Sequence, residues 1–146
     1  MKILFVENSG DAAYQLAEHL TDDGHDVLLA GDVTEAQDFW DDGGIDCLIV
    51  DLNMEPTGLG PKESEETQGG LFTGWVWLKY HVFSQNDAMR RRTIVLTAYE
   101  RDFREKVPSA EKTGVKVISK RSGQGDVYDE IVNFINMLDK TREKQR

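Results

Sequence analysis

Four charged or polar residues stand where apolar runs of the sequence end, and their types suit chemistry at phosphorus. They are Glu7, Asp51, Thr97 and Lys120, which close or follow the runs at 2–6, 45–50, 93–96 and 115–119. In an open parallel α/β sheet, ligands bind beyond the carboxyl ends of the strands. One edge of such a sheet would therefore gather two carboxylates, a hydroxyl and an ammonium.

These side chains match the needs of phosphoryl transfer. An aspartate carboxylate can attack phosphorus and form an acyl phosphate, a reaction that needs a metal ion and fixed donors to balance the developing charge. Mg²⁺ binds through one or two carboxylates and keeps several waters, and Glu7 and Asp51 supply two carboxylates. Lys120 would contact a phosphoryl oxygen as a point charge, and the Thr97 hydroxyl would donate a hydrogen bond to it.

Strand-like and helix-like segments alternate along the whole chain. Strands are expected at 2–6, 25–30, 45–50, 93–97 and 115–119, and helices at about 10–23, 34–42, 75–85, 100–112 and 126–141, with Ser9 as the cap of the first helix. Short strands rich in Val, Ile and Leu that alternate with helices predict an α/β fold, with a parallel sheet covered on both faces. The crossovers are expected to be right-handed.

Composition narrows the class of protein. The 146 residues fit one domain. A single cysteine, Cys47, rules out a disulfide framework, and with no signal-peptide pattern it predicts a cytoplasmic location. The longest apolar runs, five or six residues, are too short to span a membrane. The net charge of −10 argues against nucleic-acid binding.

The order and spacing of the strand-end residues resemble those of response-regulator receiver domains, the phosphoacceptor modules of two-component signalling. The resemblance covers essentially the whole chain and is carried by ILFVEN at 3–8, DLNM at 51–54, LTA at 96–98 and ISK at 118–120. It implies a flavodoxin-like, doubly wound sheet of five parallel strands in the order 2-1-3-4-5. It also implies a single receiver domain over residues 1–146.

The same resemblance implies a metal site. Asp51 would be the phosphorylation site, and Glu7 with Asn8 would occupy the acidic pair that holds Mg²⁺. The backbone carbonyl of Asn53 would be a further ligand. Asp51, Glu7, Asn8 and Asn53 are therefore the expected metal ligands.

The remaining roles also follow from the resemblance. Thr97 would be the switch hydroxyl, Lys120 the phosphate-contacting lysine, and Gly74 the glycine that opens the third helix. The phosphoryl donor would be a histidine kinase or a phosphotransfer protein, and the output would be contact with a downstream protein. Such a domain is not a conventional enzyme, since it catalyses at most its own phosphorylation and dephosphorylation.

Four features depart from the usual pattern of the family. Asn8 replaces the second acidic residue, so we expect weaker Mg²⁺ binding. Val117 stands where an aromatic ring is often found, and Arg121 where a proline is usual. An insertion of about fifteen residues lies within 55–73, called the insertion below. It is interpreted either as a disordered surface loop or as a lid or docking segment near Asp51.

These departures leave two functions open. The leading hypothesis is Mg²⁺-dependent phosphorylation of Asp51 that switches protein–protein contacts. The alternative is a pseudo-receiver, a protein-binding module that acts independently of phosphorylation. A flavodoxin is disfavoured by the acidic residues in 7–11, and a haloacid-dehalogenase-like phosphatase would need an aspartate at Asn53.

The segment 72–83 is rich in aromatic residues. Trp75, Leu78 and Val82 have the spacing of a buried helical face. Trp77 and Tyr80 cannot both lie on the same helical face as these three residues. Part of the aromatic surface is therefore expected to be exposed, as a place for a partner to bind.

Overall fold

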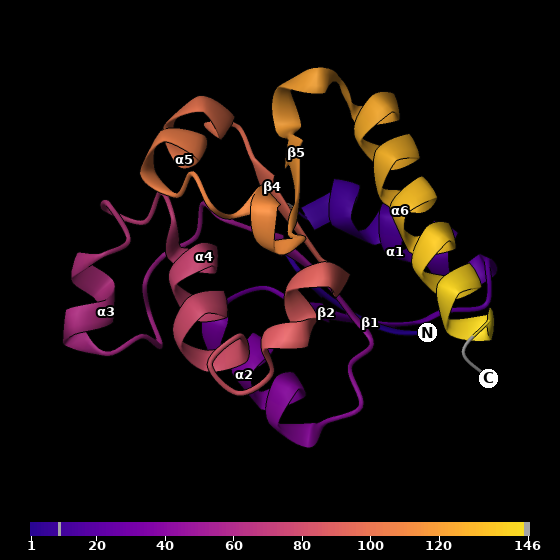
Figure 1. Ribbon diagram of the computed structural model, residues 1–146, viewed down its shortest axis with the longest axis horizontal. Helices are drawn as coiled ribbons and strands as arrows, with labels where there is room; N and C mark the ends of the chain where they lie inside the picture. Colours follow the sequence, from indigo (N-terminus) through magenta and orange to yellow (C-terminus); the bar gives the residue numbers. More distant parts are fainter. Residues whose placement is uncertain (9, 145–146) are drawn as a thin grey trace.

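A parallel sheet of five strands forms the centre of the computed structural model, which describes residues 1–8 and 10–144 (Figure 1). The strands are β1 Lys2–Val6, β2 Asp26–Ala30, β3 Cys47–Asp51, β4 Thr93–Thr97 and β5 Lys116–Ser119. They lie in the order β2-β1-β3-β4-β5, and all neighbouring pairs are parallel. The predicted doubly wound order is therefore confirmed.

Helices cover both faces of the sheet. Those on one face are α1 Gly10–Asp22 and α6 Gln124–Lys144, and those on the other are α2 Val33–Asp42, α4 Thr73–Trp77 and α5 Glu100–Lys106 (Figure 1). Successive strand residues alternate between the faces: Ile3 and Phe5 pack on the α1 side, and Leu4 and Val6 on the α2 side. The middle residues of the strands are apolar because helices cover both faces of the sheet. The predicted cap at Ser9 lies outside the described residues.

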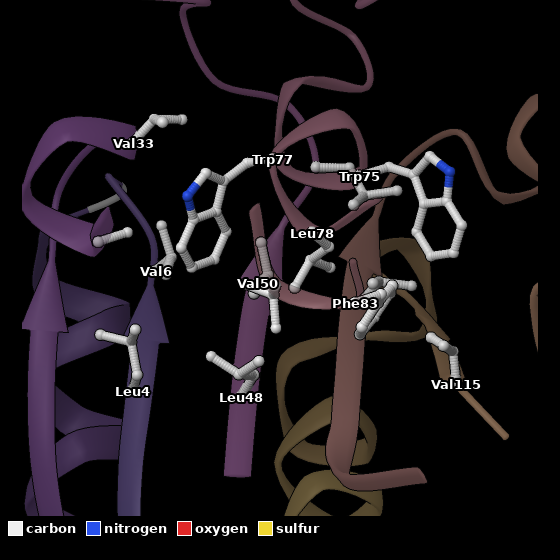
Figure 2. Packing of buried hydrophobic residues seen from close by; sticks show 14 of the residues in the cluster. Leu4, Val6, Val33, Leu48, Val50, Trp75, Trp77, Leu78, Phe83 and Val115 are labelled. Atoms are coloured by element: carbon white, nitrogen blue, oxygen red, sulfur yellow. The ribbon is translucent and has the colours of Figure 1, made fainter. Parts of the chain in front are cut away.

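The aromatic segment is more deeply buried than predicted. Helix α4 starts before the expected position 75 and continues after Trp77 as a π-helical turn at Leu78–Val82, called the π turn below. Trp77 is fully buried: its indole Nε1 donates to Gln37 Oε1 of α2 at 2.9 Å, and its ring lies over β1 and β3 (Figure 2). Tyr80, on the π turn, is the aromatic side chain of this segment that stays exposed.

Helix α5 is shorter than the predicted 100–112. It ends at Lys106 because a proline disfavours helical conformation in the residue before it, and Val107 precedes Pro108 with φ −130° and ψ 70°. Its Phe103 is fully buried and packs edge-on against Trp75, with ring centroids 5.2 Å apart. This contact joins α5 to α4.

The insertion is folded, and its two ends lie together. The Met54 amide donates to the Gly70 carbonyl at 3.1 Å, and the Thr73 hydroxyl donates to the Met54 carbonyl at 2.5 Å. A short helix, α3 Pro61–Glu65, lies between these ends. A loop with joined ends and its own packing is an Ω-loop, a compact surface unit.

Acidic side chains of the insertion bind the π turn. Glu63 Oε1 lies 2.7 Å from His81 Nε2, and Glu66 Oε1 lies 3.3 Å from Lys79 Nζ. The Tyr80 hydroxyl donates to the other Glu66 oxygen. These contacts favour a folded segment packed on the helix layer over a disordered loop.

The part of the chain that the structure describes contains neither a membrane-spanning helix nor an accessible cysteine. Within residues 1–8 and 10–144, no helix has the length and apolar character needed to cross a membrane. Cys47 is fully buried in β3, and burial raises the pKa of its thiol to about 12. Since the thiolate is the reactive form, Cys47 is a structural side chain.

Candidate functional site

Three charged side chains meet beyond the carboxyl ends of the strands. Glu7 follows β1, Asp51 ends β3 and Lys120 follows β5. The Lys120 ammonium donates to Asp51 Oδ2 at 2.9 Å and to Glu7 Oε2 at 3.2 Å. The structure thus brings together three of the residues that the sequence places at strand ends.

Burial makes this cluster electrostatically unusual. Only 2% of Asp51 and 8% of Glu7 is exposed. Burial, together with a hydrogen bond and repulsion from Glu7, raises the pKa of Asp51 to about 7, although Lys120 opposes the shift. Burial alone would lower the pKa of Lys120, but the two carboxylates together raise it. When ionised, two carboxylates face one ammonium, so the site carries an excess negative charge.

The chain turns tightly around Asp51. The Asn53 amide donates to Asp51 Oδ1 at 3.2 Å, as in an Asx turn. The Gly74 amide donates to the Leu52 carbonyl at 3.1 Å, which holds the start of α4 against this turn. A Cβ at Gly74 would overlap the Asp51 carbonyl oxygen. Glycine at this position therefore allows α4 to approach the site.

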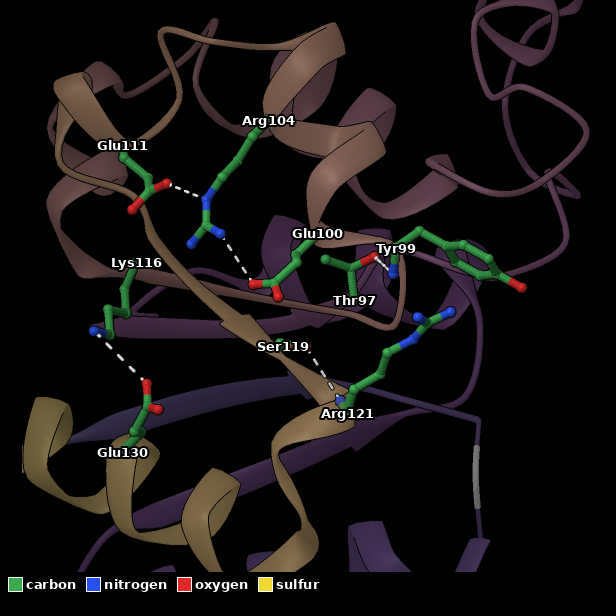
Figure 3. A network of polar contacts seen from close by, with 9 residues as sticks. All are labelled: Thr97, Tyr99, Glu100, Arg104, Glu111, Lys116, Ser119, Arg121 and Glu130. Atoms are coloured by element: carbon green, nitrogen blue, oxygen red, sulfur yellow. Dashed lines mark hydrogen bonds and ion pairs between the residues drawn. The ribbon is translucent and has the colours of Figure 1, made fainter.

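Thr97 is buried at the end of β4, the strand next to β3. Asp51 pairs with Leu96 in the sheet register, and the Leu52 amide donates to the Leu96 carbonyl at 3.0 Å. The Thr97 hydroxyl oxygen accepts a hydrogen bond from the Tyr99 amide at 3.0 Å (Figure 3). Among residues 1–8 and 10–144 the Thr97 O–H group donates no hydrogen bond, so it can donate to another acceptor at this edge of the sheet.

A cation–aromatic pair beside the site was not predicted from the sequence. The Arg121 guanidinium lies 5.9 Å from the centroid of the Tyr99 ring (Figure 3). The Arg121 amide also donates to Ser119 Oγ at 3.2 Å. Both members of the pair follow the ends of neighbouring strands, β4 and β5, which is the signal in the sequence that they lie close together.

The residues at this edge fit Mg²⁺ better than a metal with many protein ligands. Within the described part of the chain, no three His, Cys, Asp or Glu side chains form a group that could hold a metal ion. Mg²⁺ needs only one or two carboxylates and keeps several waters, and Glu7 and Asp51 form such a pair. Asn8 is exposed and borders, with Glu7, a hollow of about 270 Å³ that has room for water.

The buried carboxylate leads to a prediction about stability and pH. The raised pKa of Asp51 means that the folded protein binds a proton more tightly than the unfolded chain, so it loses stability as the pH rises from about 4 to 7. Asp51→Asn lacks this loss. We expect the variant to match the wild type below pH 4 and to be more stable by about 2 kcal/mol at pH 8 without Mg²⁺. Urea unfolding at both pH values tests this, and equal stabilities at pH 8 would contradict it.

The structure is similar to several solved receiver domains, whereas no protein-family model and no curated protein sequence matches the chain. A Francisella response regulator receiver domain is 20% identical, with 97% of this chain and 98% of that chain covered and a TM-score of 0.65. A CheY-like receiver domain protein of Methanospirillum hungatei is 15% identical, with 95% and 97% covered and a TM-score of 0.58. The receiver domain of the hybrid histidine kinase CckA is 21% identical, with 92% and 98% covered and a TM-score of 0.52.

At these identities the likeness is one of fold. It extends over nearly the whole length of this chain and of the three receiver domains. The order of the strands and the placing of helices on both faces agree with it. The chain therefore has the fold of a response-regulator receiver domain.

Proposed function

We propose that the chain is a phosphoacceptor receiver of a two-component phosphorelay, in which Asp51 takes up a phosphoryl group. The observation that carries this proposal is the Lys120 ammonium held between the Asp51 and Glu7 carboxylates. The cluster lies at the carboxyl edge of a parallel sheet, where ligands bind in this class of fold. A lysine fixed there can neutralise phosphoryl oxygens that arrive at Asp51.

In the proposed reaction, an Asp51 carboxylate oxygen attacks the phosphorus of the donor. The new O–P bond forms as the bond from phosphorus to the donor breaks, and the donor atom leaves with the bonding electron pair. Lys120 already contacts Asp51 Oδ2 at 2.9 Å, so its ammonium would also reach an oxygen of a phosphoryl group attached to Asp51. The Thr97 hydroxyl, whose oxygen accepts from Tyr99, donates its hydrogen to one of them.

A divalent cation fits the proposed reaction. Mg²⁺ would supply positive charge to the phosphoryl oxygens. Glu7 and Asp51 would hold it through carboxylate oxygens. The backbone carbonyl oxygen of Asn53 and the side-chain amide oxygen of Asn8 are the further expected ligands. Only the ionised carboxylate can attack phosphorus, and the pKa of Asp51 is raised to about 7. A cation bound beside Asp51 would favour this ionised form.

The proposed partners are proteins on both sides of the transfer. A histidine kinase or phosphotransfer protein would donate the phosphoryl group in the cytoplasm, and a downstream protein would read the altered surface. One of the similar structures is the receiver domain of a hybrid histidine kinase, which supports this setting. The added charge would act on the helices and loops that surround the site, as phosphorylation does in other switches.

Intact-mass measurement after incubation with a small-molecule phosphodonor tests the proposal. We expect a gain of one phosphoryl group that requires Mg²⁺ and is absent in Asp51→Asn. The same variant is expected to stay folded, so loss of labelling reports the acceptor itself. No gain at saturating Mg²⁺ would sink the proposal.

The second candidate is a pseudo-receiver that binds a partner without phosphorylation. Asn8 in the expected metal site and the Arg121–Tyr99 contact beside it favour this candidate. It predicts partner affinity that is the same for wild type and Asp51→Asn, with or without phosphodonor. Efficient labelling of Asp51 that changes the affinity for a partner would remove it.

A further inference from the structure

A carboxylate outside the expected set borders the same hollow as Glu7 and Asn8. It belongs to Glu35, in the first turn of α2. We propose that Glu35 is a positioning residue for the divalent cation, supplying through bound water the negative charge that Asn8 lacks. This inference rests on the proposed function, because it concerns the cation of that site.

The fold brings Glu35 to the hollow that Glu7 and Asn8 also line. The Glu7 amide donates to the Ala30 carbonyl at 2.9 Å, which joins the ends of β1 and β2. Gly31 follows directly, and Glu35 Oε1 lies 3.5 Å from the place where a Cβ at Gly31 would stand. The Glu35 carboxylate thus lies over Gly31, directly after β2, and the neighbouring strand β1 is followed by Glu7.

The backbone of Glu35 is anchored while its carboxylate is not. Asp32 caps α2 by accepting a hydrogen bond from the Glu35 amide at 2.8 Å. Within residues 1–8 and 10–144, the Glu35 carboxylate makes no hydrogen bond or ion pair. An acidic residue in the first turn also stabilises the helix by interacting favourably with the helix dipole, but this stabilisation does not depend on a cation. The two roles can therefore be separated by a Mg²⁺ titration.

Charge and coordination together explain why an outer carboxylate matters here. Glu7 and Asp51 carry two negative charges, and Lys120 offsets one of them. Mg²⁺ keeps several waters when it binds to protein carboxylates, and the hollow of about 270 Å³ between Glu7, Asn8 and Glu35 has room for water. Glu35 is not part of any direct ligand group within the described residues. Its carboxylate would instead accept hydrogen bonds from waters on the cation.

The test is a Mg²⁺ titration of the whole chain, followed by the rise in melting temperature at constant ionic strength. We expect Glu35→Gln to raise the half-saturating Mg²⁺ concentration about fivefold, because the substitution removes one nearby negative charge that attracts the cation. Asp38→Asn is the matched control, since Asp38 is exposed on the same helix and does not border the hollow. It is expected to change the midpoint less than about twofold. Asn8→Asp added to Glu35→Gln is expected to restore the midpoint of the wild type.

The outcomes separate this inference from the proposed function. Equal midpoints for Glu35→Gln and Asp38→Asn, with a clear Mg²⁺ response in the wild type, would overturn the role of Glu35 alone. A Glu35→Gln defect that Asn8→Asp fails to restore would overturn it too, because the missing quantity would then not be charge at the hollow. No response in the wild type would overturn both this inference and the Mg²⁺ requirement of the proposed function.

Discussion

Lys120→Met is expected to lower the free energy of unfolding by about 2 kcal/mol at pH 8. Methionine keeps most of the length of the side chain but removes its charge, leaving the Asp51 and Glu7 carboxylates facing each other without a cation. Breaking a fully buried pair in this way costs about 3–5 kcal/mol. The Lys120 side chain is 32% exposed, so water compensates part of the loss and we expect a smaller value.

The loss in Lys120→Met is also expected to depend on pH. The pKa of Asp51 is about 7 even with Lys120 present, so at pH 5 Asp51 is largely protonated and needs the ammonium less. The difference from wild type should therefore shrink between pH 8 and pH 5. Urea unfolding at the two pH values measures it. A loss of the same size at both would contradict the electrostatic explanation.

Two further variants make the Lys120→Met experiment specific. Lys116→Met is the matched control, because its ammonium lies 3.7 Å from an exposed carboxylate, that of Glu130. We expect that variant to cost under about 0.5 kcal/mol. Asp51→Asn combined with Lys120→Met should recover much of the lost stability, since the pair of opposed carboxylates is then gone. A double-mutant cycle over these variants gives the coupling between Asp51 and Lys120 directly.

The positions of the candidate site residues were predictable because the sheet is parallel. In such a sheet the carboxyl ends of all strands meet at one edge. A polar residue that directly follows an apolar run in the sequence can therefore be assigned to that edge. Glu7, Asp51 and Lys120 follow this rule, and the structure joins them through the Lys120 ammonium. The coordination of Mg²⁺ by these residues and the phosphorylation of Asp51 remain predictions, because they depend on a metal ion and a phosphoryl donor.

Features that depend on distant contacts were not predictable from local pattern. Trp77 is buried in the apolar cluster between the helices and the sheet, and its indole N–H donates to Gln37, a residue of α2 that lies forty positions earlier. The π turn, whose side chains bind Glu63 and Glu66 of the insertion, likewise has no local signal in the sequence. The early end of α5 is different: Pro108 is a local signal that the predicted helix 100–112 should not have crossed.

Gly74→Ala is expected to lower the free energy of unfolding by about 2–3 kcal/mol. A Cβ at this position would overlap the Asp51 carbonyl oxygen and lie 2.8 Å from Val50 Cγ1 and 3.1 Å from Leu52 Cα. Two of these three neighbours are backbone atoms at the end of β3, so the new methyl group cannot be accommodated by turning a side chain. Either α4 must move outward or the turn that holds Asp51 must shift.

The same substitution is expected to impair the site as well as the fold. Gly74 donates to the Leu52 carbonyl at 3.1 Å, so any shift of α4 is passed to the residue next to Asp51. Phosphodonor labelling should therefore fall even at temperatures where Gly74→Ala is fully folded. Gly125→Ala is the control, because a Cβ at Gly125 meets no atom within 4 Å. If Gly74→Ala matched this control in both urea unfolding and labelling, the close approach of α4 to Asp51 would not limit the site.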